Sequence, residues 1–142
     1  MELGGQEYAT LTLVEGLRDR GHVVVLVVRA GSLLQVSANE RGIPCQTITM
    51  SKSFYPWAVL QLCAIIRKKQ IDVIHTHGSP DNWIGALAAW LSRSKPIVVL
   101  ARHKSTPIAK HVINRFLYHQ LVDRIVSTGG ESLRRRLIDD HG

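Results

Sequence analysis

The sequence has few cysteines, few aromatic residues and no long apolar run. Cys45 and Cys63 are its only cysteines, and their spacing fits neither a disulfide framework nor a metal site. We therefore expect two packed thiols. No apolar stretch reaches the roughly 20 residues that a membrane span needs, and the first residues lack the charged and apolar regions of a signal peptide. These absences argue against a disulfide-rich secreted domain and predict a cytoplasmic protein.

Two kinds of catalytic signature are also absent from the sequence. No G-x-S-x-G motif is present, so the strained nucleophile turn of a serine hydrolase is not predicted. His75 and His77 form an i, i+2 pair, but no third ligand follows at a spacing typical of metal sites. We expect no metal and no other cofactor.

Positive charge is the one strong bias in the composition, since the formal net charge is +7. Such a charge favours an anionic ligand or surface. The basic residues are spread over several helix ends, which is typical of solvated faces rather than of a nucleic-acid stripe, and we expect no nucleic-acid partner. The clusters are Arg18 with Arg20, Arg67-Lys68-Lys69, Arg102 with Lys104, and Arg134-Arg135-Arg136.

Helix-like and strand-like patterns alternate along the chain. The run at 22–29 is continuously β-branched, as in parallel strands that are buried on both faces. Short connections between alternating elements predict a doubly wound parallel α/β sheet of the Rossmann-like kind. The expected helices are 7–20, 33–41, 57–69, 81–91, 108–121 and 131–139, and the expected strands are 22–29, 45–49, 72–75, 96–100 and 124–127.

The two ends of the sequence lack elements that this fold should have. The chain opens on a glycine turn before its first helix, whereas a Rossmann-type sheet has its first strand at the centre. Without that strand, two neighbouring strands would have unpaired backbone groups in the core. We expect residues 1–142 to form one domain that is truncated at both ends.

Polar segments follow the predicted strands, and these carry the candidate chemistry. Gly4 and Gly5 open a helix, where free N–H groups can meet a phosphate. The alternative is a simple turn with Glu7 on the helix dipole, because the glycine pattern is incomplete. Loops at 75–81, 102–107 and 127–132 follow three strands, and we expect them on the same rim as Gly4 and Gly5. Imidazoles, hydroxyls and cations gathered there suit a sugar and a diphosphate, although each loop taken singly could be a capped polar loop.

Four segments, taken in order, resemble the retaining GT4-type glycosyltransferases. The first joins a glycine turn to a segment similar to the family's R-G-H-x-V-x-V pattern, and each of the others runs from a predicted strand into the loop after it. They are Gly4-Gly5-Gln6-Glu7 with Arg20-Gly21-His22-Val23-Val24-Val25, Ile71-Asp72-Val73-Ile74-His75-Thr76-His77, Val99-Leu100-Ala101-Arg102-His103, and Arg124-Ile125-Val126-Ser127-Thr128-Gly129-Gly130-Glu131-Ser132.

The resemblance implies the N-terminal, acceptor-side domain of a GT-B enzyme. Such enzymes move a sugar from a nucleotide-sugar donor to an acceptor hydroxyl with retention, usually without a metal. Gly4 and Gly5 would then meet the donor diphosphate, and His103 would match the active-site histidine. His77 would lie at the cleft rim. Arg102 and Lys104 would add positive charge near the leaving phosphate.

The sequence departs from the family's pattern in ways that limit what the chain alone can do. The C-terminal donor-binding domain with its E-x7-E motif is missing, and the E-x7-E spacing of Glu7 and Glu15 in the first predicted helix is coincidental. We therefore expect this chain alone to be inactive. The acceptor would be a sugar or a lipid-linked sugar, and a peripheral membrane contact through the helix around Arg115 and Phe116 is left open. Two other functions also stay open, a non-catalytic Rossmann-like module for a nucleotide or phosphosugar, and a GT-B-shaped sugar-nucleotide epimerase.

Overall fold

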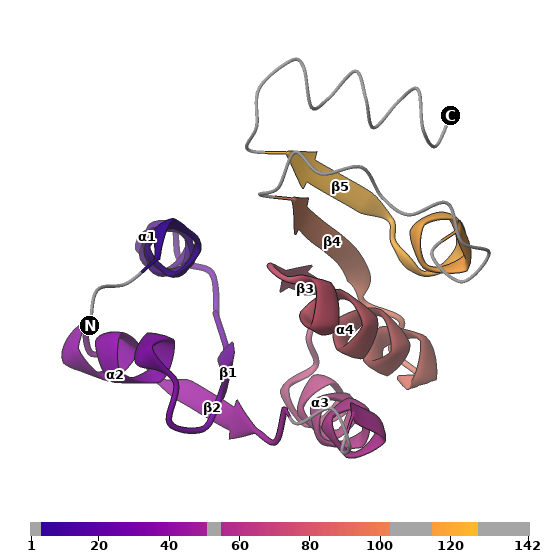
Figure 1. The fold of residues 1–142 in the computed structure, drawn as a ribbon, viewed down its shortest axis with the longest axis horizontal. Helices are drawn as coiled ribbons and strands as arrows, with labels where there is room; N and C mark the ends of the chain where they lie inside the picture. The colour runs from indigo at the N-terminus through magenta and orange to yellow at the C-terminus, as the bar shows by residue number, and fades with distance from the viewer. Residues whose placement is uncertain (1–3, 51–54, 103–114, 128–142) are drawn as a thin grey trace. The chain divides into compact units, whose positions relative to one another are not determined.

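The computed structural model describes residues 4–50, 55–102 and 115–127 of the chain. It divides into two compact units, Met1–Ala58 and Val59–Gly142 (Figure 1). The expected helix at 131–139 lies outside the described residues, as do His103, Lys104 and the first half of the helix expected at 108–121. The second half of that helix is described and is helical, with a π-helix over Leu117–Leu121.

The first unit has two helices and a pair of parallel strands. Its elements are α1 (Gly5–Asp19), β1 (Leu26–Arg29), α2 (Leu33–Glu40) and β2 (Cys45–Ile48). The two strands pair in parallel from Leu26 opposite Cys45 to Arg29 opposite Ile48. Apolar side chains from all these elements and the turn before β2 bury one another, so this unit has a core of its own. The buried core members are Leu11, Val14, Leu26, Val28, Ala38 and Ile43, and Val24, Leu34 and Cys45 pack against them.

Three helices in the chain end in the same turn. Gly21 and Gly42 follow α1 and α2 with φ angles of +83° and +63°, which a residue without a Cβ adopts at no steric cost. In each turn the next residue donates its N–H to a carbonyl five residues earlier, as His22 does to Leu17 at 3.1 Å. Gln70 has the equivalent place after α3 (Tyr55–Lys69), with φ of +50°. The predicted helix ends at Gly21 and Gly42 are thus confirmed. The sequence has no glycine to mark the equivalent helix end at Gln70.

The second unit is built around a three-stranded parallel sheet. After α3 come β3 (Val73–Thr76), α4 (Ser79–Leu91), β4 (Ile97–Arg102), the π-helix η2 (Leu117–Leu121) and β5 (Arg124–Ser127). The strand order is β3-β4-β5. Helix α4 contacts β3, β4 and η2, so α4 and η2 lie beside each other in one helical layer on the sheet (Figure 1).

Small residues let α4 lie close to this sheet. Ala86, Ala88 and Ala89 are buried, and Gly85 is in such close contact with β3 that an added Cβ would lie 2.6 Å from the Thr76 Cγ2. At the opposite edge of the sheet, Asp123 links β4 to β5. Its carboxylate accepts a hydrogen bond from the Val98 N–H at 2.8 Å. The predicted site residues begin where β3 ends, at Thr76.

The parallel α/β class is confirmed, while several predicted boundaries are wrong. The strand predicted at 22–29 covers only Leu26–Arg29, and Val23 is 94% exposed. Because β2 offers only four residues for pairing, the β-branched run before Leu26 has no ladder partner there. Arg102, predicted in a loop after the fourth strand, is the last residue of β4.

Candidate functional site

Parallel pairing brings three strand ends of the second unit to one edge of its sheet. Thr76 lies opposite Leu100, and Arg102 lies opposite Ser127. His77 therefore leaves the sheet at the same carboxyl edge at which Arg102 ends β4. For these residues the predicted gathering on one rim is confirmed. Gly4 and Gly5 belong to the other unit, and their place on this rim stays a prediction.

Two histidine rings lie in contact at this edge. The ring centroids of His75 and His77 are 4.5 Å apart with an interplanar angle of 37°. Residues i and i+2 of an extended strand point to the same face, which accounts for this pairing. Both histidines are half-buried, and the Nε2 atom of His75 is itself buried. Imidazole nitrogens can donate and accept hydrogen bonds, which suits contact with sugar hydroxyls or phosphate oxygens.

A buried hydrogen bond fixes the turn between β3 and α4. The Thr76 hydroxyl donates to the Asn82 side-chain oxygen at 2.7 Å, and the Asn82 N–H donates to the Gly78 carbonyl at 2.8 Å. Thr76 and Asn82 are 5% and 7% exposed, so losing one partner would leave a buried polar group unsatisfied. The interpretation that Asp81 or Asn82 caps α4 is wrong. The N-cap is Gly78, and Asn82 instead binds the strand below the helix.

The first turn of α4 supplies both positive potential and an unusual carboxyl group at this edge. Gly78 caps the helix without a side-chain hydrogen bond, so the first turn can offer a ligand its remaining backbone N–H groups, although Pro80 there has none. Asp81 lies in that turn and is half-buried. Burial raises the pKa of its carboxyl because desolvation penalises the charged form. The sequence predicted Asp81 only as a helix cap. Carboxyl groups with shifted pKa values are nevertheless common near strand ends that form binding sites.

Arg102 adds a guanidinium to the same edge. It is half-buried at the end of β4. A planar guanidinium presents several donors in a geometry that matches phosphate oxygens, and it is charged at all working pH values. The edge therefore combines imidazoles, a helix N-terminus and a fixed cation. This set can bind an anion and orient a hydroxyl, and the neighbouring His103 and Lys104 lie outside the described residues.

In the other unit, the predicted phosphate loop has its own anion already in place. Gly4 is the extended N-cap of α1, and Gly4 and Gly5 are both exposed. A Cβ at Gly4 would lie 2.5 Å from a Glu7 carboxylate oxygen, so the Glu7 side chain folds back over the helix N-terminus. A negative charge there is stabilised by the helix dipole. The alternative role of Glu7 at this turn thus has direct geometric support, and a bound diphosphate would have to displace that carboxylate.

The coincidental E-x7-E spacing has a structural explanation as well. Glu15 pairs with Arg41, whose Nη1 lies 3.3 Å from a Glu15 carboxylate oxygen, and this pair ties α1 to the end of α2. The Arg41 guanidinium also lies 5.6 Å from the ring centre of Tyr8. Glu15 therefore serves packing between two helices in the described structure.

Two further properties bear on ligands and membranes. In the part of the chain that the structure describes, no group of three or more histidine, cysteine or acidic side chains could hold a metal ion. No helix among the described residues is long and apolar enough to cross a bilayer.

Two comparisons relate this chain to known proteins. The crystal structure of MurG from Acinetobacter baumannii is similar to this chain, with a TM-score of 0.69 and 15% sequence identity. The match covers 91% of this chain and 39% of that chain, so the chain spans well under half of the MurG chain. At this identity the likeness defines the fold, a Rossmann-like α/β half of the GT-B architecture.

The family follows from the sequence match. The model of Glycosyltransferase Family 4 matches residues 3–142, and the chain therefore belongs to this family. The predicted resemblance is confirmed. A search of curated proteins finds no match.

Proposed function

We propose that this chain forms the acceptor-side, N-terminal domain of a glycosyltransferase. The enzyme would move a sugar from a nucleotide-sugar donor to an acceptor hydroxyl with retention, in glycan, lipopolysaccharide or glycolipid synthesis. One observation carries the proposal in addition to family membership. The His75–His77 pair, Arg102 and the N-terminus of α4 gather at the carboxyl edge of one parallel sheet, where open α/β sheets bind ligands.

Each site residue has a proposed role in this transfer. His103 is the catalytic histidine beside the transferring sugar, and His77 helps to hold the acceptor at the rim. Arg102 and Lys104 stabilise the charge that develops on the departing diphosphate, and such fixed electrostatic help is commonly the largest catalytic contribution. The edge would also hold the two substrates in a reactive orientation.

Gly4 and Gly5 are proposed to meet the donor diphosphate once the Glu7 carboxylate turns away. The nucleotide and its sugar would bind mainly to a C-terminal donor-binding domain, which completes the enzyme. No metal is required in this scheme, because Arg102, Lys104 and helix N-termini supply the positive charge. The acceptor is a sugar or a lipid-linked sugar, and the latter would bring the enzyme to a membrane surface.

The test is turnover of the full-length protein, measured as release of nucleoside diphosphate. We expect His103→Ala to remove most turnover, by about 100-fold or more, while nucleotide affinity stays close to that of the wild type. His22→Ala is the matched control, since His22 is exposed in the turn after α1. Unchanged turnover in His103→Ala would contradict the role of His103. A wild-type protein that binds nucleotide without turnover would favour the binding module, and formation of an epimeric sugar nucleotide would favour the epimerase.

A further inference from the structure

Helix α4 has one buried face, and an acidic residue lies at the start of that face. The buried residues of the face recur at helical spacing and are Ile84, Gly85, Ala88 and, at the C-cap, Ser92. Asp81 lies three residues before Ile84 and four before Gly85, so it belongs to the same face. An apolar side chain at this position would extend the packing of α4, and the carboxyl group found there therefore needs another explanation.

Helix capping does not account for Asp81. The N-cap is Gly78, and Asn82 bonds to Thr76. Within the described part of the chain, the Asp81 side chain has no ion pair and no hydrogen bond. The positive end of a helix favours a carboxylate in the first turn. Burial nevertheless raises the pKa of Asp81, so desolvation of the charged form is the stronger effect. A charged Asp81 thus lowers stability at neutral pH, as residues retained for function often do.

The backbone places the Asp81 side chain at the candidate site. Side chains of a helix lean toward its N-terminus, so that of Asp81 leans toward the edge where β3 ends. The bond between Thr76 and Asn82, at 2.7 Å, holds the residue next to Asp81 against that strand end. His77 leaves β3 at the same edge, and Arg102 ends β4 there. Asp81 therefore adds a carboxylate to an edge whose other groups are imidazoles, a guanidinium and a helix N-terminus.

The chemistry of this edge restricts what the carboxylate can bind. A phosphate would be repelled by it and is better placed on Arg102, whose positive charge also disfavours a cationic ligand beside Asp81. Zinc sites use three or four protein ligands, and among the described residues no group of three suitable side chains is present. Neutral hydroxyl groups remain. They donate hydrogen bonds, and a bond to an ionised acceptor is about twice as strong as a neutral one.

We propose that Asp81 binds hydroxyl groups of the acceptor sugar and so contributes to acceptor specificity. Its carboxylate accepts hydrogen bonds from two neighbouring hydroxyls of one sugar ring, while Arg102 is left to the donor diphosphate. Opposite charges on one edge thus separate the anionic donor from the neutral acceptor. The inference rests on the proposed function for the statement that the bound sugar is an acceptor, whereas sugar binding itself can be measured without turnover.

The test is binding of the methyl glycosides of glucose, galactose and mannose to the full-length protein, followed by NMR titration. We expect the wild type to bind at least one of them. Asp81→Asn keeps the size of the side chain without its charge, and it should weaken this binding about 10-fold because a charge-assisted bond becomes a neutral one. Asp81→Ala should weaken it at least as much. Urea denaturation at neutral pH should show that Asp81→Asn is no less stable than the wild type, which separates loss of binding from loss of fold.

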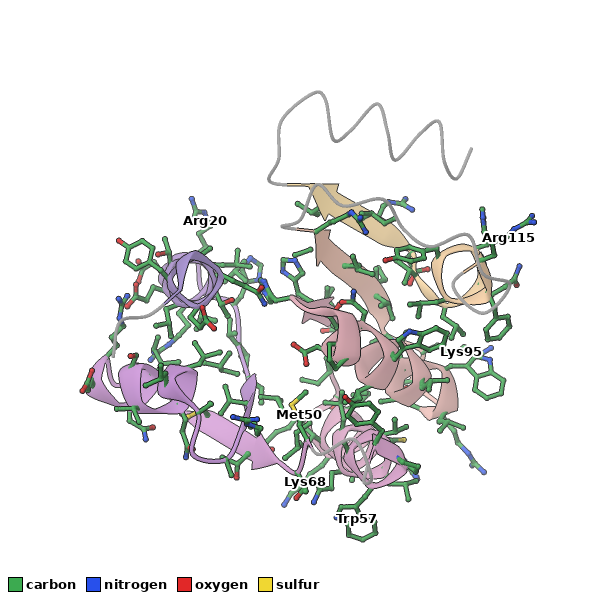
Figure 2. All side chains as sticks on the ribbon, in the orientation of Figure 1. Arg20, Met50, Trp57, Lys68, Lys95 and Arg115 are labelled. Atoms are coloured by element: carbon green, nitrogen blue, oxygen red, sulfur yellow. The ribbon has the colours of Figure 1, made fainter. Side chains whose placement is uncertain are left out.

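Asp72→Asn is the matched control in the same unit. Asp72 is exposed and lines a cavity at the amino ends of the strands together with Lys95, which Figure 2 shows near the C-terminal end of α4. Removing its charge should change glycoside affinity less than about twofold, because a distant exposed charge is screened.

Four results would overturn the role of Asp81. They are a wild type that binds none of the three glycosides, unchanged affinity in Asp81→Asn, an equal loss in Asp72→Asn, and binding that disappears in EDTA, since the carboxylate would then hold a metal ion. Failure of the proposed function gives a different result. Asp81-dependent glycoside binding without release of nucleoside diphosphate from any nucleotide sugar would contradict glycosyl transfer and still support Asp81 as a sugar-binding residue.

Discussion

Single residues at the end of β3 combine packing with the positioning of the candidate site. Gly85 has no room for a Cβ because Thr76 lies against it, and Thr76 in turn bonds to Asn82. Thr76 also stands between the two histidines whose rings are in contact. A substitution that displaces Thr76 should therefore affect both the stability of the protein and the contact between the two histidine rings.

Replacing Gly85 with alanine tests this close contact. The added Cβ would lie 2.6 Å from the Thr76 Cγ2, so helix or strand must shift, and we expect a loss of about 1–3 kcal/mol in the free energy of unfolding. Urea denaturation provides the measurement. Gly16→Ala in α1 is the matched control, where only the end of the Arg20 side chain is near, and it should be neutral or stabilising by up to about 1 kcal/mol. If both variants have equal stability, the packing argument fails.

Asp81 should make stability depend on pH in a defined direction. Its pKa in the folded protein is raised by desolvation, so the folded state holds the proton more tightly than the unfolded state does. The stabilisation from this proton is fully present below the ordinary carboxyl pKa. It is lost as pH rises through the higher pKa of the folded protein. Asp81→Asn should therefore be more stable than the wild type at neutral pH, with the difference shrinking toward acid pH. A difference that instead grows toward acid pH in urea titrations would contradict this assignment.

At the scale of elements, the ends of helices follow from the sequence only where glycine marks them. Gly21 and Gly42 could be predicted as helix stops because the left-handed conformation favours glycine. Gln70 adopts the same conformation without any local signal in its residue type. The N-cap of α4 was also missed, because the Asn82 side chain bonds to Thr76 in another element instead of capping the helix.

Gln70→Gly tests the energetic side of this helix end. The left-handed conformation of a residue with a Cβ lowers the stability of the folded state by about 1–2 kcal/mol. Glycine removes this cost, but its greater freedom in the unfolded chain offsets part of the gain. We expect Gln70→Gly to raise the free energy of unfolding by about 0.5–1 kcal/mol. The reverse change at an equivalent turn, Gly42→Ala, should lower it by about 1 kcal/mol. Thermal and urea unfolding would measure both, and a loss of stability in Gln70→Gly would show that its side chain has a stabilising contact.

At the scale of the whole molecule, the alternation of elements was enough to predict parallel sheets and a Rossmann-like class. That pattern reflects burial on both strand faces, which the sequence records directly in β4 and in the core of the first unit. The strand-end position of His77 and Arg102 followed from the same alternation. The contact between the two histidine rings and the shifted Asp81 carboxyl could not be predicted in this way. They depend on how separate elements pack, which local patterns do not encode.

The central claim is that the carboxyl edge of β3 and β4 acts in glycosyl transfer. Its most direct measurement is nucleoside diphosphate release by the full-length protein carrying Arg102→Gln. We expect turnover to fall about 100-fold or more, because the variant lacks the guanidinium that we propose to stabilise the departing diphosphate. Arg20→Gln, an exposed change at the end of α1, should leave turnover unchanged. Wild-type turnover in a folded Arg102→Gln variant would contradict the assignment of this edge as the site of transfer.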